Sequence, residues 1–192
     1  MKVSNNSNNG HVSWQKGIIL KNDDRPIYEA KKIDIDNFRK DGVVLIRGIM
    51  CDWVEKLRHG LQRNLDNPEK YAFPCESNPK GESGRFFDSY CNWQLIPEYL
   101  DFVSNSCAAS IAGQFMDTAY VQFFHDHAFC KAPGTRRATP WHHDLPYYCV
   151  DGVKTASVYV SLDKAESDVA VNFVKGSHRW NKLFYPRIFE DG

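Results

Sequence analysis

The chain has 192 residues, a length typical of a single domain, and its 24 basic residues balance 24 acidic ones. A zero net charge gives no overall field that would attract nucleic acid or an anionic membrane surface. No apolar run has the length of a transmembrane helix, and residues 1–10 contain no signal-peptide core. We therefore expect a small-molecule partner and neither a nucleic-acid nor a membrane partner; the sequence does not indicate an oligomeric state.

The six cysteines are scattered, and none belongs to a Cys-x-x-Cys pair. Such a distribution is typical of free thiols in a reducing compartment rather than of a disulfide framework or a zinc knuckle. The sequence therefore predicts a cytoplasmic protein. The aromatic content of 14% favours a β-rich fold with an apolar pocket.

The first part of the chain divides into a polar segment and a folded region. Residues 1–26 are rich in Asn, Ser and Asp, so we expect them to be disordered or loosely attached, with one domain over 27–192. Residues 43–47, between Gly42 and Gly48, predict a short buried strand. A helix is expected to begin at Asp52, which can cap it, and to end at Asn67-Pro68. Its apolar residues recur at helical spacing and are Trp53, Leu57, Leu61 and Leu65.

Residues 68–92 predict a long loop, which the pair Phe86-Phe87 anchors. A second helix is expected from about Pro97 to Gln114, because Pro suits the first turn and one face stays apolar. Short strands separated by turn signals follow, at 120–124, 128–131, 141–148, 155–162 and 169–174. Helices followed by a run of strands indicate an α+β fold with an antiparallel sheet or barrel.

The segment at 139–148 contains the residue pair with the most distinctive chemistry, His142 and Asp144. In an extended chain, side chains two residues apart leave the same face, so imidazole and carboxylate converge while His143 points away. Two such ligands and a third His form the site of non-haem Fe(II) oxygenases. With 7 His and 16 Asp in the chain, chance alone gives about 0.6 His-x-Asp tripeptides. Taken alone, the tripeptide is better explained by a polar strand end with a hydrogen-bonded His.

An ordered set of segments carries more information than the tripeptide. In their order and separation these segments resemble the phytanoyl-CoA dioxygenase (PhyH) family of Fe(II)- and 2-oxoglutarate-dependent oxygenases, over about residues 33–190. They are 38–48, Arg85-Phe86-Phe87, 123–127, 130–135, 139–147 and 173–178.

The resemblance implies a double-stranded β-helix, which is a jelly-roll or cupin-like barrel, with N-terminal helices and iron at its mouth. Carried over by position, His142 and Asp144 are catalytic iron ligands, and Tyr159 and His127 line the site of 2-oxoglutarate. The implied cofactors are Fe(II), 2-oxoglutarate and O2. The implied reaction hydroxylates a small organic substrate, such as an acyl-CoA ester or another metabolite, and releases succinate. Halogenating relatives lack the carboxylate, so Asp144 indicates a hydroxylase.

The resemblance is incomplete at the C-terminal end. The family's third iron ligand, a distal His, and the Arg that binds 2-oxoglutarate lie on late barrel strands that have no counterpart before Gly192. We therefore expect the N-terminal part of such a domain, truncated before the last barrel strands. Two alternatives remain, a non-catalytic jelly-roll binding domain without the third ligand and a less favoured zinc hydrolase that uses the same pair.

Other charged residues near these segments have two possible roles. His178 is a candidate third ligand, although a turn residue bonded to backbone is the simpler interpretation. His125 is expected to pack in the core. Arg136-Arg137 could receive the phosphates of a coenzyme A ester, but loop charges are usually solvated.

Overall fold

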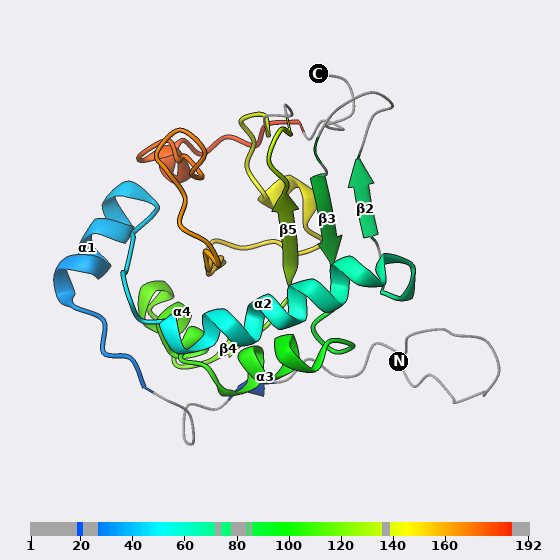
Figure 1. Cartoon of the computed structure of the whole chain (residues 1–192). Coiled ribbons are helices and arrows are strands. Elements are labelled where there is room, and N and C mark those ends of the chain that lie inside the picture. Colours follow the sequence, from blue (N-terminus) through cyan, green and yellow to red (C-terminus); the bar gives the residue numbers. More distant parts are fainter. Residues whose placement is uncertain are drawn as a thin grey trace, which may run out of the picture.

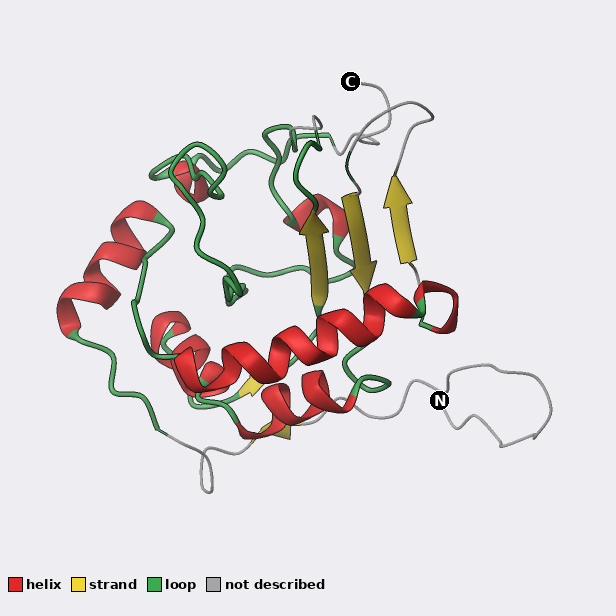
Figure 2. Cartoon of the chain, in the orientation of Figure 1, coloured by secondary structure: helices red, strands yellow, loops and turns green. Residues whose placement is uncertain are grey.

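The computed structural model describes residues 19–20, 27–71, 74–77, 84, 86–135 and 139–185. It contains helices and two small antiparallel sheets, so the predicted α+β class is confirmed (Figure 2). The helices are α1 (Lys32–Asp41), α2 (Cys51–Asp66), α3 (Pro97–Asn105) and α4 (Ala108–Met116), with the 3-10 turns η2 (Pro68–Lys70), η3 (Leu145–Tyr147) and η4 (Ser177–Arg179). The strands are β1 (Ile19–Leu20), β2 (Pro74–Ser77), β3 (Phe86–Tyr90), β4 (Val121–Gln122) and β5 (His127–Lys131).

The larger sheet has the order β2-β3-β5, with β3 in the centre (Figure 1). Side chains alternate across a strand, and in β3 the fully buried residues are Phe87 and Ser89. Ser89 hydrogen-bonds Asn64 of α2 at 3.2 Å, so this face of the sheet is turned toward the helices. The side chains on the opposite side define the open face of the sheet, which consists of Phe86, Asp88, Tyr90, His127, Phe129 and Lys131.

Two apolar clusters hold the helices together. One joins α2, α3 and the sheet through the buried residues Leu57, Tyr71, Ile96 and Tyr99. The other lies between α1 and α4 and has Met50, Ile111 and Phe115 at its centre. The ring of Phe38 in α1 meets the ring of Phe115 edge-on at 5.2 Å, so aromatic packing fixes α1 against α4.

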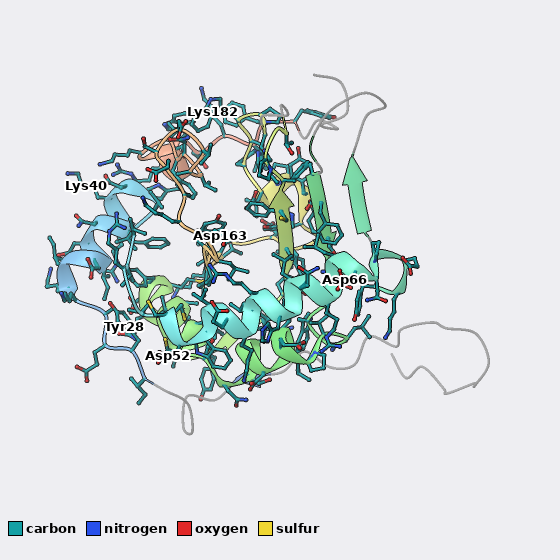
Figure 3. The ribbon with its side chains drawn as sticks, in the orientation of Figure 1. Tyr28, Lys40, Asp52, Asp66, Asp163 and Lys182 are labelled. Atoms are coloured by element: carbon teal, nitrogen blue, oxygen red, sulfur yellow. The ribbon has the colours of Figure 1, made fainter. Side chains whose placement is uncertain are left out.

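The segment from residue 150 to 185 is irregular apart from η4, and several described contacts attach it to the rest of the chain. Arg58 of α2 donates to the carbonyl of Leu162 at 2.5 Å and pairs with Asp163 at 3.0 Å, in the turn labelled in Figure 3. At the C-terminal end of α1, Gly176 N–H donates to the carbonyl of Asp41 at 2.8 Å. His178 Nε2 donates to the carbonyl of Arg39 at 3.0 Å.

Several local predictions are confirmed. Helix α2 ends at Asp66 before Asn67-Pro68, although Asp52 lies in its first turn and makes no side-chain cap. Phe87 is fully buried, as expected for an anchor, and the strand at 128–131 is present as β5. The long loop predicted over 68–92 is wrong, because this range contains η2 and the strands β2 and β3.

Other local predictions were wrong. Residues 43–47 are irregular rather than a buried strand, and Leu45 is 70% exposed. The expected helix from Pro97 to Gln114 is two helices, because the chain breaks at Ser106 between α3 and α4. Helix α1 and strand β3 were not anticipated, and the strand at 120–124 shrinks to the two residues of β4.

The predicted barrel does not close within the described ranges. Residues 141–148, 155–162 and 169–174 form no strands there, and Val153, Val169 and Phe173 are exposed. A β-branched sequence becomes a strand only where a neighbouring strand completes its ladder, and the described sheet ends at β5. The boundary at residue 26 stays a prediction, because apart from β1 residues 1–26 lie outside the described ranges. No described helix combines the length and the apolar composition needed to cross a bilayer.

The adjacent residues Phe86 and Phe87 provide a test of the sheet's orientation. Phe87→Ala should lower the free energy of unfolding by about 3–5 kcal/mol, because it removes a fully buried aromatic ring. Phe86→Ala, on the open face, should cost less than about 1.5 kcal/mol. Chemical denaturation measures both, and equal losses would show that the two faces are wrongly assigned.

A second pair of variants tests how the turn at 175–178 is attached to α1. Gly42 and Gly48 both have positive φ, 81° and 83°, so an Ala at either site adds similar backbone strain. A Cβ at Gly42 would overlap the His178 ring, whereas a Cβ at Gly48 would have no neighbour within 4 Å. Gly42→Ala should therefore destabilise the protein by about 1–3 kcal/mol more than Gly48→Ala. In a His178→Ala background this difference should disappear, and its persistence would refute the contact.

Candidate functional site

The structure brings His142 and Asp144 together through a turn rather than a strand. Asp144 has helical backbone angles, φ −77° and ψ −31°, and directly precedes η3. His142 Nε2 nevertheless lies 3.3 Å from Asp144 Oδ1. The side chains are 32% and 52% exposed, so a ligand from solvent can reach both.

A backbone contact sets the orientation of the His142 ring. Nδ1 lies 2.8 Å from the carbonyl of Pro140. A carbonyl only accepts hydrogen bonds, so Nδ1 carries the proton, and in the neutral ring the lone pair of Nε2 faces the Asp144 carboxylate. Two electron-rich atoms placed in this way attract a shared cation. Metal-binding histidines are commonly fixed by the same kind of bond from their other ring nitrogen.

His143 points elsewhere and has a different role. Its Nε2 accepts the backbone N–H of Phe184 at 2.9 Å, and the two rings meet edge-on at 5.4 Å. The adjacent imidazole therefore holds the segment near residue 184 and is not part of the His142–Asp144 pair.

Aromatic residues line the region beside Asp144. Tyr148 packs edge-on against Phe124 at 5.4 Å and His125 at 5.1 Å. Burial raises the pKa of Tyr148 to about 12, and the charge of Asp144 adds to this rise. Burial lowers the pKa of His125, His127 lowers it further, and Asp144 opposes the shift. The Asp144 carboxylate thus acts on both rings, and His125 packs among aromatic residues.

His127 and Tyr159 lie near each other on the open face of the sheet. His127 stacks on Tyr90 with ring centroids 4.0 Å apart, and its Nε2 contacts Asp88 Oδ1. Tyr159 stacks on Phe129 at 5.9 Å, and Phe129 also meets the His127 ring at 5.4 Å. Phe129 therefore links the two positions expected to line the co-substrate site.

The sequence reasoning did not identify Asp88 and Tyr90 as neighbours of His127. The sequence analysis places residues 86–90 in a loop, so it draws no inference from the alternation of their side chains between the two faces of a strand. Had they been predicted as a strand, pairing with 127–131 would have brought Asp88 and Tyr90 to the face that carries His127.

The His142–Asp144 pair brings together two donor atoms of the kinds that metal sites use. Imidazole and carboxylate are donors that suit Fe(II), so the residues present fit this metal as part of its ligand set. In the described part of the chain, no group of three His, Cys, Asp or Glu side chains could hold a metal ion. His178 does not join the pair, because it is bonded to the end of α1. Arg85 and Arg136-Arg137 lie outside the described residues.

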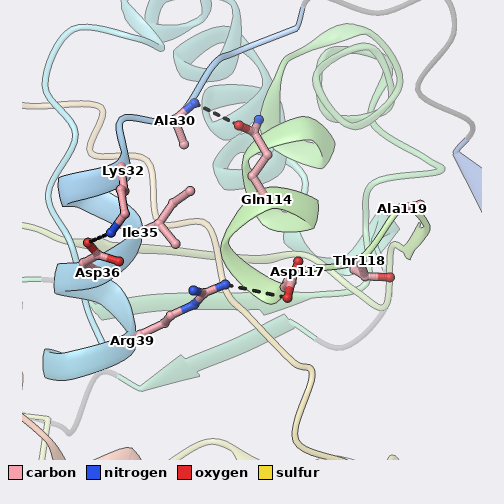
Figure 4. A pocket seen from close by; sticks show the side chains of 9 residues that line it. All are labelled: Ala30, Lys32, Ile35, Asp36, Arg39, Gln114, Asp117, Thr118 and Ala119. Carbon is pink, nitrogen blue, oxygen red and sulfur yellow. Dashed lines mark hydrogen bonds and ion pairs between the residues drawn. The ribbon is translucent and has the colours of Figure 1, made fainter.

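A hollow of about 530 Å³ lies between α1 and α4 (Figure 4), and neither His142 nor Asp144 lines it. Its charged side chains pair with one another, Lys32 with Asp36 at 2.5 Å and Arg39 with Asp117 at 3.7 Å. These pairs are exposed, and the hollow gathers no unbalanced charge for a ligand to meet. It is not the candidate site.

Comparison with known proteins gives one match. The family described as phytanoyl-CoA dioxygenase (PhyH) matches residues 38–189. No curated protein and no solved structure matches the chain. The matched range contains α2, the β2-β3-β5 sheet and the His142–Asp144 pair, and it covers most of the sequence. The chain therefore belongs to the phytanoyl-CoA dioxygenase family.

Proposed function

We propose that this protein is an Fe(II)- and 2-oxoglutarate-dependent dioxygenase that hydroxylates a small organic substrate, an acyl-CoA ester or another metabolite. The observation that carries the proposal is the 3.3 Å approach of His142 Nε2 to Asp144 Oδ1, with Nδ1 held by a backbone carbonyl. Family membership supports the same reaction class and a small-molecule substrate.

Each residue of the site has a defined task in this proposal. His142 Nε2 and the Asp144 carboxylate hold Fe(II), while Pro140 keeps the imidazole in the tautomer that presents Nε2. When Fe(II) and 2-oxoglutarate are bound, they supply the oxidising chemistry that uses O2, releases succinate and carbon dioxide, and hydroxylates the substrate. His127 and Tyr159 line the co-substrate on the open face. The carboxylate of Asp144 fills a ligand position that would otherwise admit a halide, which favours hydroxylation.

A non-catalytic jelly-roll binding domain is the second candidate. It is favoured by one observation, that the described residues do not assemble a third metal ligand. Such a domain would bind a metal or a small molecule without turnover.

Three single variants test the metal pair. The wild-type protein should bind Fe(II) under anaerobic conditions with a Kd weaker than roughly 1 µM, because it offers two protein ligands rather than three. His142→Ala and Asp144→Ala should each abolish this binding in calorimetry, because each removes one ligand. His143→Ala is the matched control, since His143 bonds the Phe184 backbone, and it should retain binding. Binding that survives in His142→Ala would remove this residue from the site.

Succinate formation separates the two candidate functions. The dioxygenase should release succinate from 2-oxoglutarate above an iron-free control, and His142→Ala should not. Fe(II) binding without succinate release would favour the binding domain.

A further inference from the structure

The segment that carries the metal pair is tied to the sheet at Thr139, three residues before His142. Lys131, the last residue of β5, donates from Nζ to Thr139 Oγ1 at 3.0 Å. The same Nζ lies 4.9 Å from the centroid of the Phe86 ring, so a side chain of β3 also holds the ammonium. Phe86 is opposite Lys131 in the strand register. The pairing of β3 with β5 therefore determines where Thr139 lies.

The chain from Thr139 onward transmits this position to His142. Pro140 follows Thr139 directly, and its carbonyl accepts the hydrogen bond from Nδ1 of His142 at 2.8 Å. A proline ring fixes its own φ at about −65° and restricts the residue before it to extended conformations. Few backbone angles can therefore change between the Thr139 side chain and the Pro140 carbonyl. A displacement of Thr139 moves the carbonyl that orients the His142 ring.

Contacts farther along the same segment act on other residues. His143 accepts the N–H of Phe184, which itself belongs to the irregular segment 150–185. Tyr148 packs against Phe124 beyond the turn η3. These contacts hold the segment after His142, whereas Lys131 holds it before His142. The contact at Thr139 is thus the one that can set the direction from which the Pro140 carbonyl meets the imidazole.

We propose that the Lys131–Thr139 contact positions His142 for metal binding, because it fixes the Pro140 carbonyl that holds the ring. This inference rests on the proposed function and assigns Lys131 and Thr139 as positioning residues of the site. Neither residue touches the metal, and their contact transfers no proton or electron. Its consequence in the metal-free protein is that Nδ1 of His142 carries the proton and Nε2 keeps its lone pair toward Asp144.

The variant Thr139→Val tests the contact, because it removes the hydroxyl and keeps the branched shape of the side chain. ¹⁵N NMR of histidine-labelled protein, without metal and at about pH 8, reports which nitrogen of the neutral ring carries the proton. The wild-type His142 should have its proton on Nδ1. In Thr139→Val the two tautomers should mix, because the acceptor for Nδ1 is no longer fixed. Thr139→Ser keeps the hydroxyl and should retain the wild-type spectrum.

Metal affinity provides a second readout. The EPR signal of unbound Mn(II), used in place of Fe(II), measures the Kd of the metal. Thr139→Val and Lys131→Met should each raise this Kd about 3- to 10-fold, the effect expected from the loss of one hydrogen bond. The double variant should bind no more weakly than either single variant, because both residues act through one contact. Additive losses would show that the residues act separately and would refute the inference.

A second lysine tether provides the matched control. Lys154 Nζ donates to the carbonyl of Asp117 at 2.7 Å and so attaches a different part of the chain. Lys154→Met should change neither the His142 tautomer nor the Kd of Mn(II).

The outcomes separate this inference from the proposed function. If Thr139→Val leaves the His142 tautomer unchanged while the wild type binds Mn(II), the inference fails and the proposed function stands. If the tautomers mix and the Kd stays the same, the contact has a structural role only, and the inference fails. If the wild type does not bind Mn(II) through His142, the proposed function and the inference both fail.

Discussion

The antiparallel pairing of β3 with β5 is the constraint on which both the core and the candidate site depend. It aligns five residue pairs, from Phe86 opposite Lys131 to Tyr90 opposite His127. Because side chains alternate along a strand, a slip of one residue would turn Phe87 out of the core and Asp88 into it. The same register gathers the aromatic and charged residues of the open face. Stability and site geometry are therefore linked through one set of backbone hydrogen bonds.

The elements predicted correctly from the sequence are those with local signals. Helix α2 has an apolar face at helical spacing and a proline just beyond its end, and neither signal needs a distant partner. The break between α3 and α4 was missed because the apolar spacing continues across it. There Ser106 is buried and its hydroxyl accepts the N–H of Ala108 at 3.3 Å, a local alternative to helical bonding. The segments at 155–162 and 169–174 have a strand-like composition. A strand also needs a neighbouring strand to pair with, and the composition of a segment does not show whether such a neighbour is present.

The proximity of His142 and Asp144 was predicted, but the way in which the chain brings them together was not. The convergence of His142 and Asp144 was expected from the alternation of a strand, whereas the structure achieves it with a turn at Asp144. The sequence alone did not reveal contacts between residues far apart in the chain. One example is the contact between Asp88 and His127, which are 39 residues apart. These contacts arise from sheet register, which only the assembled fold specifies.

The proposed function requires His142 and Asp144 to hold one metal ion between them. Side-chain NMR of protein labelled with ¹⁵N-histidine, titrated with small amounts of Mn(II), tests it directly, because the paramagnetic ion broadens the nearest ring resonances first. We expect the ring resonances of His142 to broaden before those of His178, which is bonded to the end of α1, and we expect Asp144→Ala to abolish this preference. Broadening of His178 before His142, or an unchanged pattern in Asp144→Ala, would contradict it.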